Sequence, residues 1–170
     1  VLNHRTLPCA LLLLVALFAS AIQAAPAAVG AEALANLEGK TILLGGATGK
    51  NGRHVLQRLH DLGLNVRAMT RDVEDARDDI GAQYNWVEAD VTKPETLTAA
   101  VKDVDIVISA IATAMPFGGN RSEKVDYEGT INLSKAAKGE GATRFVIITS
   151  SSSGVRDHFL NKIGGNVLIW

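Results

Sequence analysis

The stretch that decides the fold runs from Lys40 to Arg53 and reads Lys-Thr-Ile-Leu-Leu-Gly-Gly-Ala-Thr-Gly-Lys-Asn-Gly-Arg. A short apolar run ends at Leu44, glycines follow at positions 46, 49 and 52, and a helical pattern begins at once. This order predicts a strand, a glycine turn and a helix. The first N–H groups of such a helix and the positive end of its dipole meet at one place, where a diphosphate can bind.

Each glycine of this turn has an expected task. We expect Gly46 to make the tight turn, Gly49 to let the backbone approach the phosphates and Gly52 to let the helix lie close to the strand. The backbone between them, which includes Lys50 and Asn51, is expected to hold the diphosphate. A glycine-rich connection without a ligand remains open as the alternative.

The composition limits the classes of function. The chain has 170 residues, a formal net charge of −1 and 47% hydrophobic residues, which suits one α/β domain and gives no electrostatic argument for nucleic-acid binding. Aromatic residues make up only 5%, which argues against a stacking platform for bases. The single cysteine, Cys9, leaves no disulfide framework and no cysteine metal site within one chain, and we predict no metal site.

The first thirty residues differ from the rest of the chain. His4 and Arg5 precede an apolar run at 10–19, small residues follow as far as Pro26, and no charged residue lies between Arg5 and Glu32. This pattern is typical of a secretory signal peptide over residues 1–30. The open alternatives are a membrane anchor over 7–29, an organellar transit peptide, and an extension that the natural protein lacks, which would leave the protein cytoplasmic. We expect residues 31–39 to form a linker and 40–170 to form one domain.

Strand and helix patterns alternate through this domain. The expected strands and helices, in chain order, are 42–44, 51–62, 64–70, 72–80, 84–88, 93–101, 105–110, 122–138 and 144–149. The first, fourth and fifth strands are continuous apolar runs, as in a parallel sheet that helices cover on both faces. Right-handed crossovers then predict a doubly wound α/β sheet, the Rossmann fold. Part of a (β/α)₈ barrel is the alternative, but the domain is short for one. Residues 166–170 carry no stop signal, so we expect the domain to be truncated at its C-terminus.

The end of the second strand bears on the choice of cofactor. A Rossmann domain that prefers NAD usually places an acid there to bind the ribose 2′-hydroxyl. Here Thr70 occupies that neighbourhood and Arg71 follows, and a guanidinium can bind a 2′-phosphate, which favours NADPH over NADH. The alternative is a solvated arginine paired with Asp72 or Asp75. Arg67 is a weaker candidate, because alternation along the strand is expected to turn it to the other face.

Two further strand ends are candidate parts of the same site. Asp90 and Val91 follow the third strand, where adenine would lie, and the Asp90 carboxylate could accept a hydrogen bond from the adenine amino group. The alternative for Asp90 is an acid near the start of the helix at Pro94. Ala110 belongs to a run of small residues at the end of the fourth strand, where the cofactor ribose could pass close to the backbone.

Serines follow the fifth strand. Ser151, or with less support Ser150, could bond a substrate carbonyl or a developing oxyanion, although serines are also ordinary loop residues. Neither tyrosine of the chain has a lysine four positions later, so the sequence contains no Tyr-x-x-x-Lys pair.

Five segments occur in an order that resembles a known family. They are Gly46–Gly52, Val66–Asp72, Ala89–Val91, Val125–Leu133 and Arg144–Ser151. Residues 40–170 resemble the atypical short-chain dehydrogenase/reductases, the NAD(P)-binding group that includes NmrA-like and biliverdin/flavin-reductase-like proteins. The resemblance implies a Rossmann fold and NADP(H) binding through Gly46, Thr48, Gly49, Gly52, Arg71, Asp90 and Val91.

The resemblance leaves the reaction open. The leading hypothesis is an NADPH-dependent oxidoreductase that acts on a small carbonyl-like or conjugated substrate. Because the family also contains redox-sensing regulators and assembly factors, a non-catalytic NADP(H)-sensing protein is the alternative. Membrane association could arise through the N-terminal segment. The sequence predicts neither the substrate nor the oligomeric state.

Overall fold

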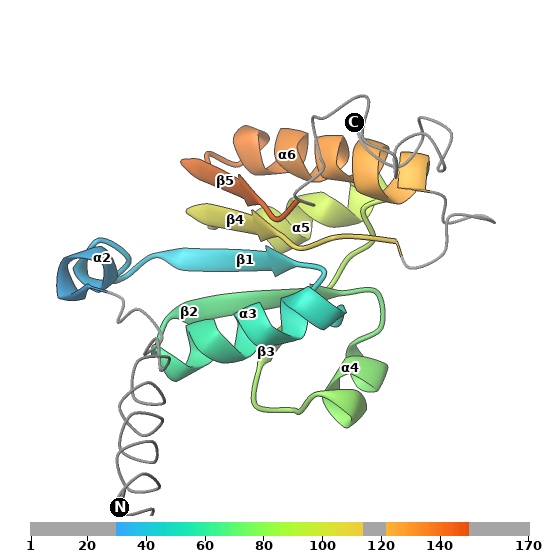
Figure 1. Cartoon of the computed structure of the whole chain (residues 1–170). Coiled ribbons are helices and arrows are strands. Elements are labelled where there is room, and N and C mark those ends of the chain that lie inside the picture. The colour runs from blue at the N-terminus through green and yellow to red at the C-terminus, as the bar shows by residue number, and fades with distance from the viewer. Residues whose placement is uncertain (1–29, 114–121, 150–170) are drawn as a thin grey trace, which may run out of the picture. The chain divides into compact units, whose positions relative to one another are not determined.

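A parallel five-stranded sheet forms the centre of the domain. The computed structural model describes residues 30–113 and 122–149. Its strands are β1 Thr41–Gly45, β2 Asn65–Thr70, β3 Asn85–Glu88, β4 Ile106–Ser109 and β5 Arg144–Ile147. They pair in parallel in the order β3-β2-β1-β4-β5 (Figure 1). The order reverses at β1, as in the Rossmann fold, which confirms the predicted doubly wound sheet.

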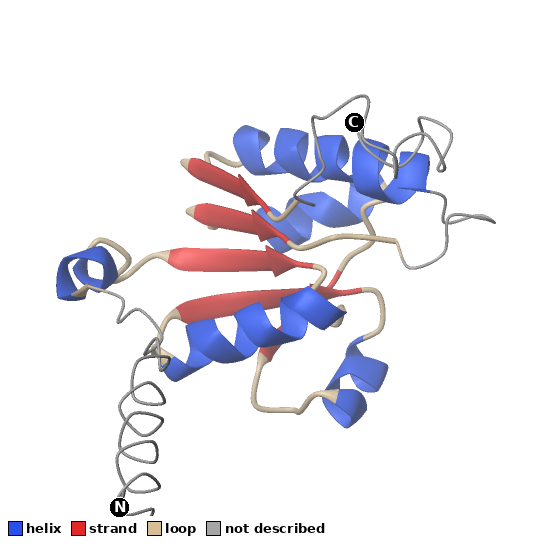
Figure 2. Ribbon diagram, in the orientation of Figure 1, coloured by secondary structure: helices blue, strands red, loops and turns tan. Residues whose placement is uncertain are grey.

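Helices cover both faces of the sheet (Figure 2). They are α3 Lys50–Asp61, α4 Val73–Asp79, the 3₁₀-helix η1 Pro94–Thr96, α5 Leu97–Val101, the π-helix η2 Glu123–Glu128 and α6 Gly129–Gly139. On one face, Leu44 of β1 packs in a core with Leu56 of α3, and α4 adds to that core. On the other face, Leu43 packs in a core with Leu133 of α6, and α5 adds to it. Successive residues of β1 are therefore buried on opposite faces, which explains its continuous apolar run.

The apolar run of the fifth strand is less buried than its pattern predicts. Exposed fractions are 42% for Val146, 49% for Ile147 and 38% for Ile148. Within the described residues β5 pairs with β4 alone, and Phe145 is the β5 residue that packs against the core beside α6. The expectation that this strand is buried on both faces is therefore wrong for the described part of the chain.

The expected helix at 122–138 is in fact two helices of different pitch. The N–H of Gly129 donates to the carbonyl of Lys124, five residues earlier, so η2 has a wider turn than the α6 helix that follows it.

The region expected as a linker, 31–39, contains the short helix α2, Ala31–Ala35. This helix belongs to a compact unit that ends at Asn36, and the Rossmann unit begins at Leu37.

The expected signal peptide or anchor lies outside the described residues. Among residues 30–113 and 122–149, no helix combines the length and the apolar character needed to cross a bilayer.

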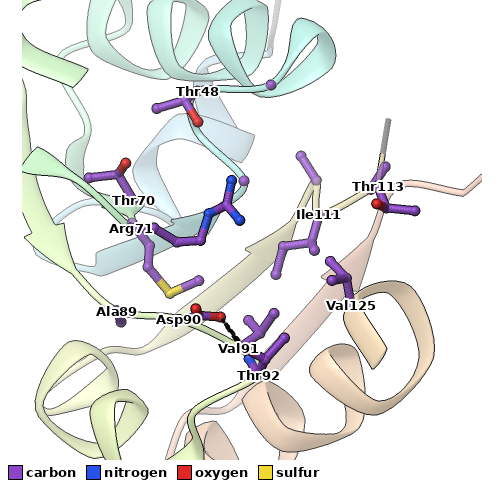
Figure 3. A pocket seen from close by; sticks show the side chains of 15 residues that line it. Thr48, Thr70, Arg71, Ala89, Asp90, Val91, Thr92, Ile111, Thr113 and Val125 are labelled. Carbon is purple, nitrogen blue, oxygen red and sulfur yellow. Dashed lines mark hydrogen bonds between the residues drawn. The ribbon is translucent and has the colours of Figure 1, made fainter. Parts of the chain in front are cut away.

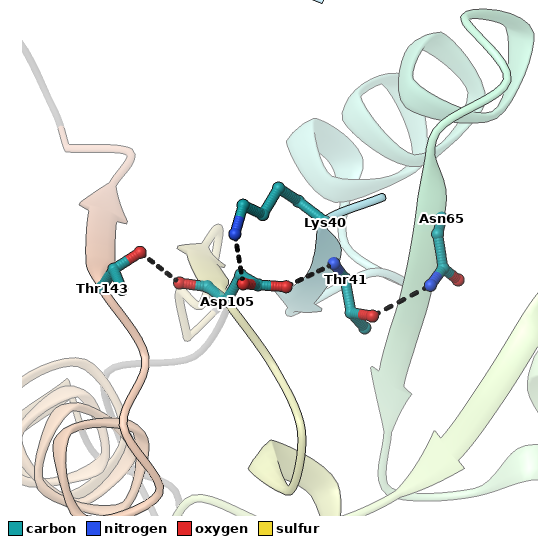
Figure 4. A network of polar contacts seen from close by, with 5 residues as sticks. All are labelled: Lys40, Thr41, Asn65, Asp105 and Thr143. Atoms are coloured by element: carbon teal, nitrogen blue, oxygen red, sulfur yellow. Dashed lines mark hydrogen bonds and ion pairs between the residues drawn. The ribbon is translucent and has the colours of Figure 1, made fainter. Parts of the chain in front are cut away.

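Asp105 fastens the amino-terminal edge of the sheet (Figure 4). Its two carboxylate oxygens accept hydrogen bonds from Nζ of Lys40 and from the N–H of Thr41, each at 2.9 Å. Its carbonyl accepts the N–H of Thr143 at 2.8 Å, and Asn65 donates to the Thr41 hydroxyl at 2.9 Å. One residue before β4 is thereby tied to the starts of β1 and β5, at the edge opposite the glycine turn.

Candidate nucleotide-binding site

The glycine turn has the geometry that the sequence predicts. Gly46 follows β1 with φ of +75°, and a Cβ there would lie 2.7 Å from the carbonyl oxygen of Ala110. A side chain would therefore be strained by its backbone and would collide with the end of β4. A Cβ at Gly52 would overlap the carbonyl oxygen of Gly46. The helix α3 consequently lies as close to the turn as a backbone without side chains permits.

The amino terminus of α3 is open to an anion. Its N-cap residue, Gly49, makes no side-chain capping bond, and its first turn contains no acid. In the described part of the chain, the N–H groups of Lys50, Asn51 and Gly52 find no acceptor. The neighbouring helix α4 differs, because Asp72 caps it by accepting the N–H of Asp75 at 3.0 Å. The first turn of α3 thus presents unpaired donors and a positive dipole end.

A cavity of about 380 Å³ lies beside this turn, at the carboxyl ends of the strands (Figure 3). The predicted site residues that line it are Gly46, Thr48, Gly49, Arg71, Asp90, Val91 and Ala110. Lys50, Asn51 and Gly52 do not line it; their unpaired N–H groups lie in the first turn of α3, directly after the lining residue Gly49. The lining residues that sequence reasoning did not select as site residues are Met69, Thr70, Ala89, Thr92, Ile111, Ala112, Thr113 and Val125.

Arg71 and Asp90 are the two charged residues in this lining. The Arg71 side chain extends into the cavity in Figure 3, and within the described residues its guanidinium makes no hydrogen bond or ion pair. Neither Asp72 nor Asp75, the alternative partners expected from the sequence, forms an ion pair with Arg71 in the described residues. The Asp72 carboxylate caps α4, and no ion pair joins Asp75 to Arg71 in the described structure.

Thr70 stands where an acid would bind a ribose hydroxyl. Its hydroxyl donates to the carbonyl of Asp72 at 3.1 Å and accepts the N–H of Asp72 at 3.3 Å, so it closes the turn that leads into α4. The end of β2 therefore offers the cavity a guanidinium and a hydroxyl in a local turn, with no carboxylate in the lining from this strand.

Arg67 has a structural task. Its Nη1 donates to the carbonyls of Ala100 and Lys102, each at 2.8 Å, and so binds the carboxyl end of α5. A guanidinium is well suited to these unpaired carbonyls, because the end of a helix carries partial negative charge. Arg67 does not line the cavity, in agreement with its expected orientation toward the other face of the sheet.

Asp90 organises the turn after β3. One carboxylate oxygen, Oδ1, accepts the N–H of Thr92 at 2.9 Å and the Thr92 hydroxyl at 2.8 Å, while the N–H of Asp90 donates to the Thr96 hydroxyl at 3.0 Å. The N-cap of η1 is Lys93, with no side-chain capping bond, so the Asp90 carboxylate does not cap that helix. Its second oxygen, Oδ2, has no partner among the described residues and remains available to a donor in the cavity.

The predicted catalytic serines, Ser150 and Ser151, lie outside the described residues, and their role stays a prediction. Across residues 30–113 and 122–149, no three His, Cys, Asp or Glu side chains gather in a way that could hold a metal ion.

Comparison with known proteins identifies the family. Residues 46–167 match the NAD(P)H-binding family. A chloroplastic protein of Arabidopsis thaliana named At2g34460 is 36% identical over 65% of this chain and 41% of its own length. The photosystem II assembly factor Ycf39 of Guillardia theta is 35% identical over 64% of this chain and 34% of its own length. The chain thus spans less than half the length of these two relatives.

Reductases are also among the relatives. Sanguinarine reductase of Eschscholzia californica is 29% identical over 76% of this chain and 61% of its own length. Two other relatives, from Arabidopsis thaliana and Zea mays, have names that describe them as chloroplastic.

Solved structures share the fold. A putative NAD-dependent epimerase/dehydratase from Bacillus halodurans superimposes with a TM-score of 0.63 at 25% identity, over 77% of this chain and 62% of the other. A short-chain dehydrogenase/reductase superfamily protein from Agrobacterium tumefaciens, solved with bound NAD, gives a TM-score of 0.56 at 27% identity, over 66% and 33%. These matches confirm the resemblance seen in the sequence motifs: the chain belongs to the NAD(P)H-binding family, and its structural neighbours are members of the short-chain dehydrogenase/reductase superfamily.

Proposed function

We propose that this domain binds NADPH in preference to NADH and is the cofactor-binding domain of an NADPH-dependent oxidoreductase. The observation that carries the proposal is the Arg71 guanidinium, which lines the cavity and has no partner among the described residues. A free guanidinium can bind a 2′-phosphate with two parallel hydrogen bonds, whereas a ribose 2′-hydroxyl is best held by an acid. Here β2 ends at Thr70, so the position of that acid is occupied by a threonine.

The remaining parts of the cavity suit the rest of the dinucleotide. The open N–H groups at the start of α3 would hold the diphosphate, with Thr48 and Gly49 beside it. The free oxygen of Asp90 would accept the adenine amino group. Ala110 presents a small side chain to the cavity, where a ribose would pass. When bound, NADPH supplies the hydride, and the chain's own residues bind it, orient it and exclude water around it.

For the substrate we propose a small carbonyl-like or conjugated molecule. The support is the similarity to sanguinarine reductase and the cofactor chemistry itself, since hydride transfer needs an electrophilic carbon. Ser151, or Ser150 in second place, would bond the substrate oxygen on which negative charge develops.

The alternative is a non-catalytic NADP(H)-sensing protein that acts in assembly or regulation. It is favoured by the 35% identity to a photosystem II assembly factor. Steady oxidation of NADPH by the full chain with a panel of carbonyls and quinones would support the enzyme. Tight NADPH binding without turnover on the same panel would support the sensor.

The chloroplastic relatives bear on the N-terminal segment. Among the interpretations of residues 1–30 that the sequence allows, the chloroplastic relatives support targeting to an organelle. A fluorescent protein fused after residue 40 and expressed in plant cells would test this, and secretion of the fusion would instead support the signal peptide.

The cofactor preference is tested by fluorescence titration of the purified full chain with NADPH and NADH. We expect NADPH to bind at least about tenfold more tightly, a difference of about 1.4 kcal/mol. Arg71→Ala should abolish the preference. Arg77→Ala removes the same charge from the exposed surface of α4, where Arg77 makes no described contact, and should keep it. Equal affinities in the unchanged protein would refute the preference, and no binding to a folded chain would refute the nucleotide site.

A further inference from the structure

One helical segment, η2 together with α6, touches both walls of the cavity. The first wall is the segment after β4. Its residues Ile111, Ala112 and Thr113 line the cavity, beyond the last sheet bond from the N–H of Ala110 to the carbonyl of Gly45. The N–H of Thr113 donates to Oδ1 of Asp126 at 2.7 Å. A part-buried carboxylate on η2 therefore holds the backbone of this wall after the strand has ended.

The second wall is the turn after β3. Nδ2 of Asn132, on α6, donates to the carbonyl of Val91 at 3.0 Å. Gly129 lies against the same residue, since a Cβ there would be 2.5 Å from Cγ2 of Val91. Val91 is 6% exposed and its side chain belongs to the core beside α6. The backbone that carries Asp90 is thus fixed from outside by an amide donor and by close contact with a helix.

The pitch of the segment changes between these two contacts. The π turn ends at Gly129, the residue packed on Val91. It contains Val125, which lines the cavity, and Asp126, which bonds the wall after β4. A π turn has poorer hydrogen-bond geometry than an α turn and is usually retained for a local demand. Here the demand is contact with two separate walls from one helical segment.

We propose that Asp126 and Asn132 are positioning residues for the bound dinucleotide. Asn132 sets the turn at Asp90 and so the adenine half of the cavity; Asp126 sets the wall at Thr113 and so the half toward the nicotinamide. This inference rests on the proposed function, because it assigns the two walls to the two halves of NADPH. Neither residue lines the cavity, so each acts through the backbone that it holds.

The two halves of the ligand can be tested separately in the full chain. Adenosine 2′,5′-bisphosphate carries the adenine half alone, whereas NADPH carries both halves. Asn132→Leu keeps the side-chain size and removes the donor, and we expect it to weaken both ligands by the same factor, about two- to tenfold for one lost hydrogen bond. Asp126→Ala should weaken NADPH by a similar factor and leave the bisphosphate unchanged. Asp126→Asn keeps an acceptor for the Thr113 N–H and should restore NADPH binding.

Controls separate this role from a general loss of structure. Lys135→Leu changes an exposed residue of α6 without a described contact and should alter neither affinity. Circular dichroism and thermal melting check that each variant is folded; where Asn132→Leu does not fold, Asn132→Asp removes the same donor. The inference is overturned if Asp126→Ala weakens the bisphosphate as much as it weakens NADPH, if Asn132→Leu weakens NADPH alone, or if neither variant changes affinity. Failure of the unchanged protein to bind either ligand would instead overturn the proposed function.

Discussion

The Nε atom of Arg53 donates to the carbonyl oxygen of Thr48 at 2.9 Å, so the first turn of α3 holds the glycine turn that precedes it. The same peptide unit is held at its other end, because the N–H of Gly49 donates to the carbonyl of Gly46 at 3.1 Å. The guanidinium also pairs with Asp79, at the end of α4. The Thr48–Gly49 peptide is therefore fixed before any ligand arrives, and the N–H groups that follow it remain free.

Arg53→Met should weaken NADPH binding. It keeps the aliphatic stem and removes both the hydrogen bond to Thr48 and the ion pair with Asp79, so part of the binding energy must then order the turn. We expect a loss of about two- to fivefold, the lower part of the range for one hydrogen bond because Arg53 is exposed. Titration with NADPH measures it.

Two variants define the origin of that loss. Asp79→Asn removes the ion pair and keeps the Thr48 bond, so its effect should be within about twofold, as for exposed pairs. Arg58→Met changes another exposed arginine of α3 and should have no effect. A loss in Asp79→Asn as large as the loss in Arg53→Met would show that the ion pair, and not the hydrogen bond from Arg53 to the Thr48 carbonyl, orders the turn.

Gly52→Ala should destabilise the domain. The added methyl group would overlap the Gly46 carbonyl, which belongs to the backbone and cannot rotate away. Forced displacement of α3 from the turn is expected to lower the free energy of unfolding by about 1–3 kcal/mol. Urea denaturation followed by circular dichroism measures the change.

Gly139→Ala is the matched control. This glycine ends α6, and a Cβ there would have no atom within 4 Å. The substitution should be neutral or stabilise the domain by at most about 1 kcal/mol, since alanine favours helix more than glycine does. If both variants were equally stable, the close approach of α3 to the turn would not depend on glycine.

Arg67→Met should lower stability and leave the cofactor preference unchanged. It removes two donors from the carbonyls at the end of α5, and we expect the free energy of unfolding to fall by about 1–3 kcal/mol. The ratio of NADPH to NADH affinity should match that of the unchanged protein. A change in this ratio would contradict the prediction and would show that Arg67 contributes to cofactor recognition.

The features that the sequence predicted correctly are those with local causes. The glycine turn follows from the conformational freedom of Gly46 and from the spacing to Gly52, and both were confirmed. The strand β1 was expected at 42–44 and extends one residue further at each end. The doubly wound sheet was predicted from the alternation of strands and helices together with right-handed crossovers, which occur in almost all such folds, and the structure confirms it.

The features that the sequence did not predict depend on distant neighbours. The π turn of η2 ends where Gly129 meets Val91, a contact between residues 38 positions apart in the chain. The bonds of Arg67 to the end of α5 and of Asp126 to Thr113 likewise require the tertiary arrangement. The exposure of β5 was missed because an apolar run indicates two buried faces only where other elements cover both.

The last prediction concerns pH and the far edge of the sheet. The hydrogen bond from Lys40, followed by that from the N–H of Thr41, lowers the pKa of Asp105 below its ordinary value of 3.8. Because the folded state lowers this pKa, the ionised carboxylate stabilises the fold fully above about pH 3.8, and its contribution is lost as the pH falls through the lower, folded value.

Asp105→Asn should therefore be less stable than the unchanged protein at pH 7, and the difference should shrink as the pH falls below 4. The asparagine side chain can still accept the N–H of Thr41, but it neither titrates nor attracts the Lys40 ammonium. Lys40→Met removes the first cause of the pKa shift and should reduce the same pH-dependent part. Urea denaturation from pH 7 to pH 3 measures all three proteins. If the curves for the unchanged protein and Asp105→Asn run parallel over that range, the carboxylate contributes no pH-dependent stability. The network in Figure 4 would then act only through the neutral hydrogen bonds from Asn65 to the Thr41 hydroxyl and from the Thr143 hydroxyl to the Asp105 carbonyl.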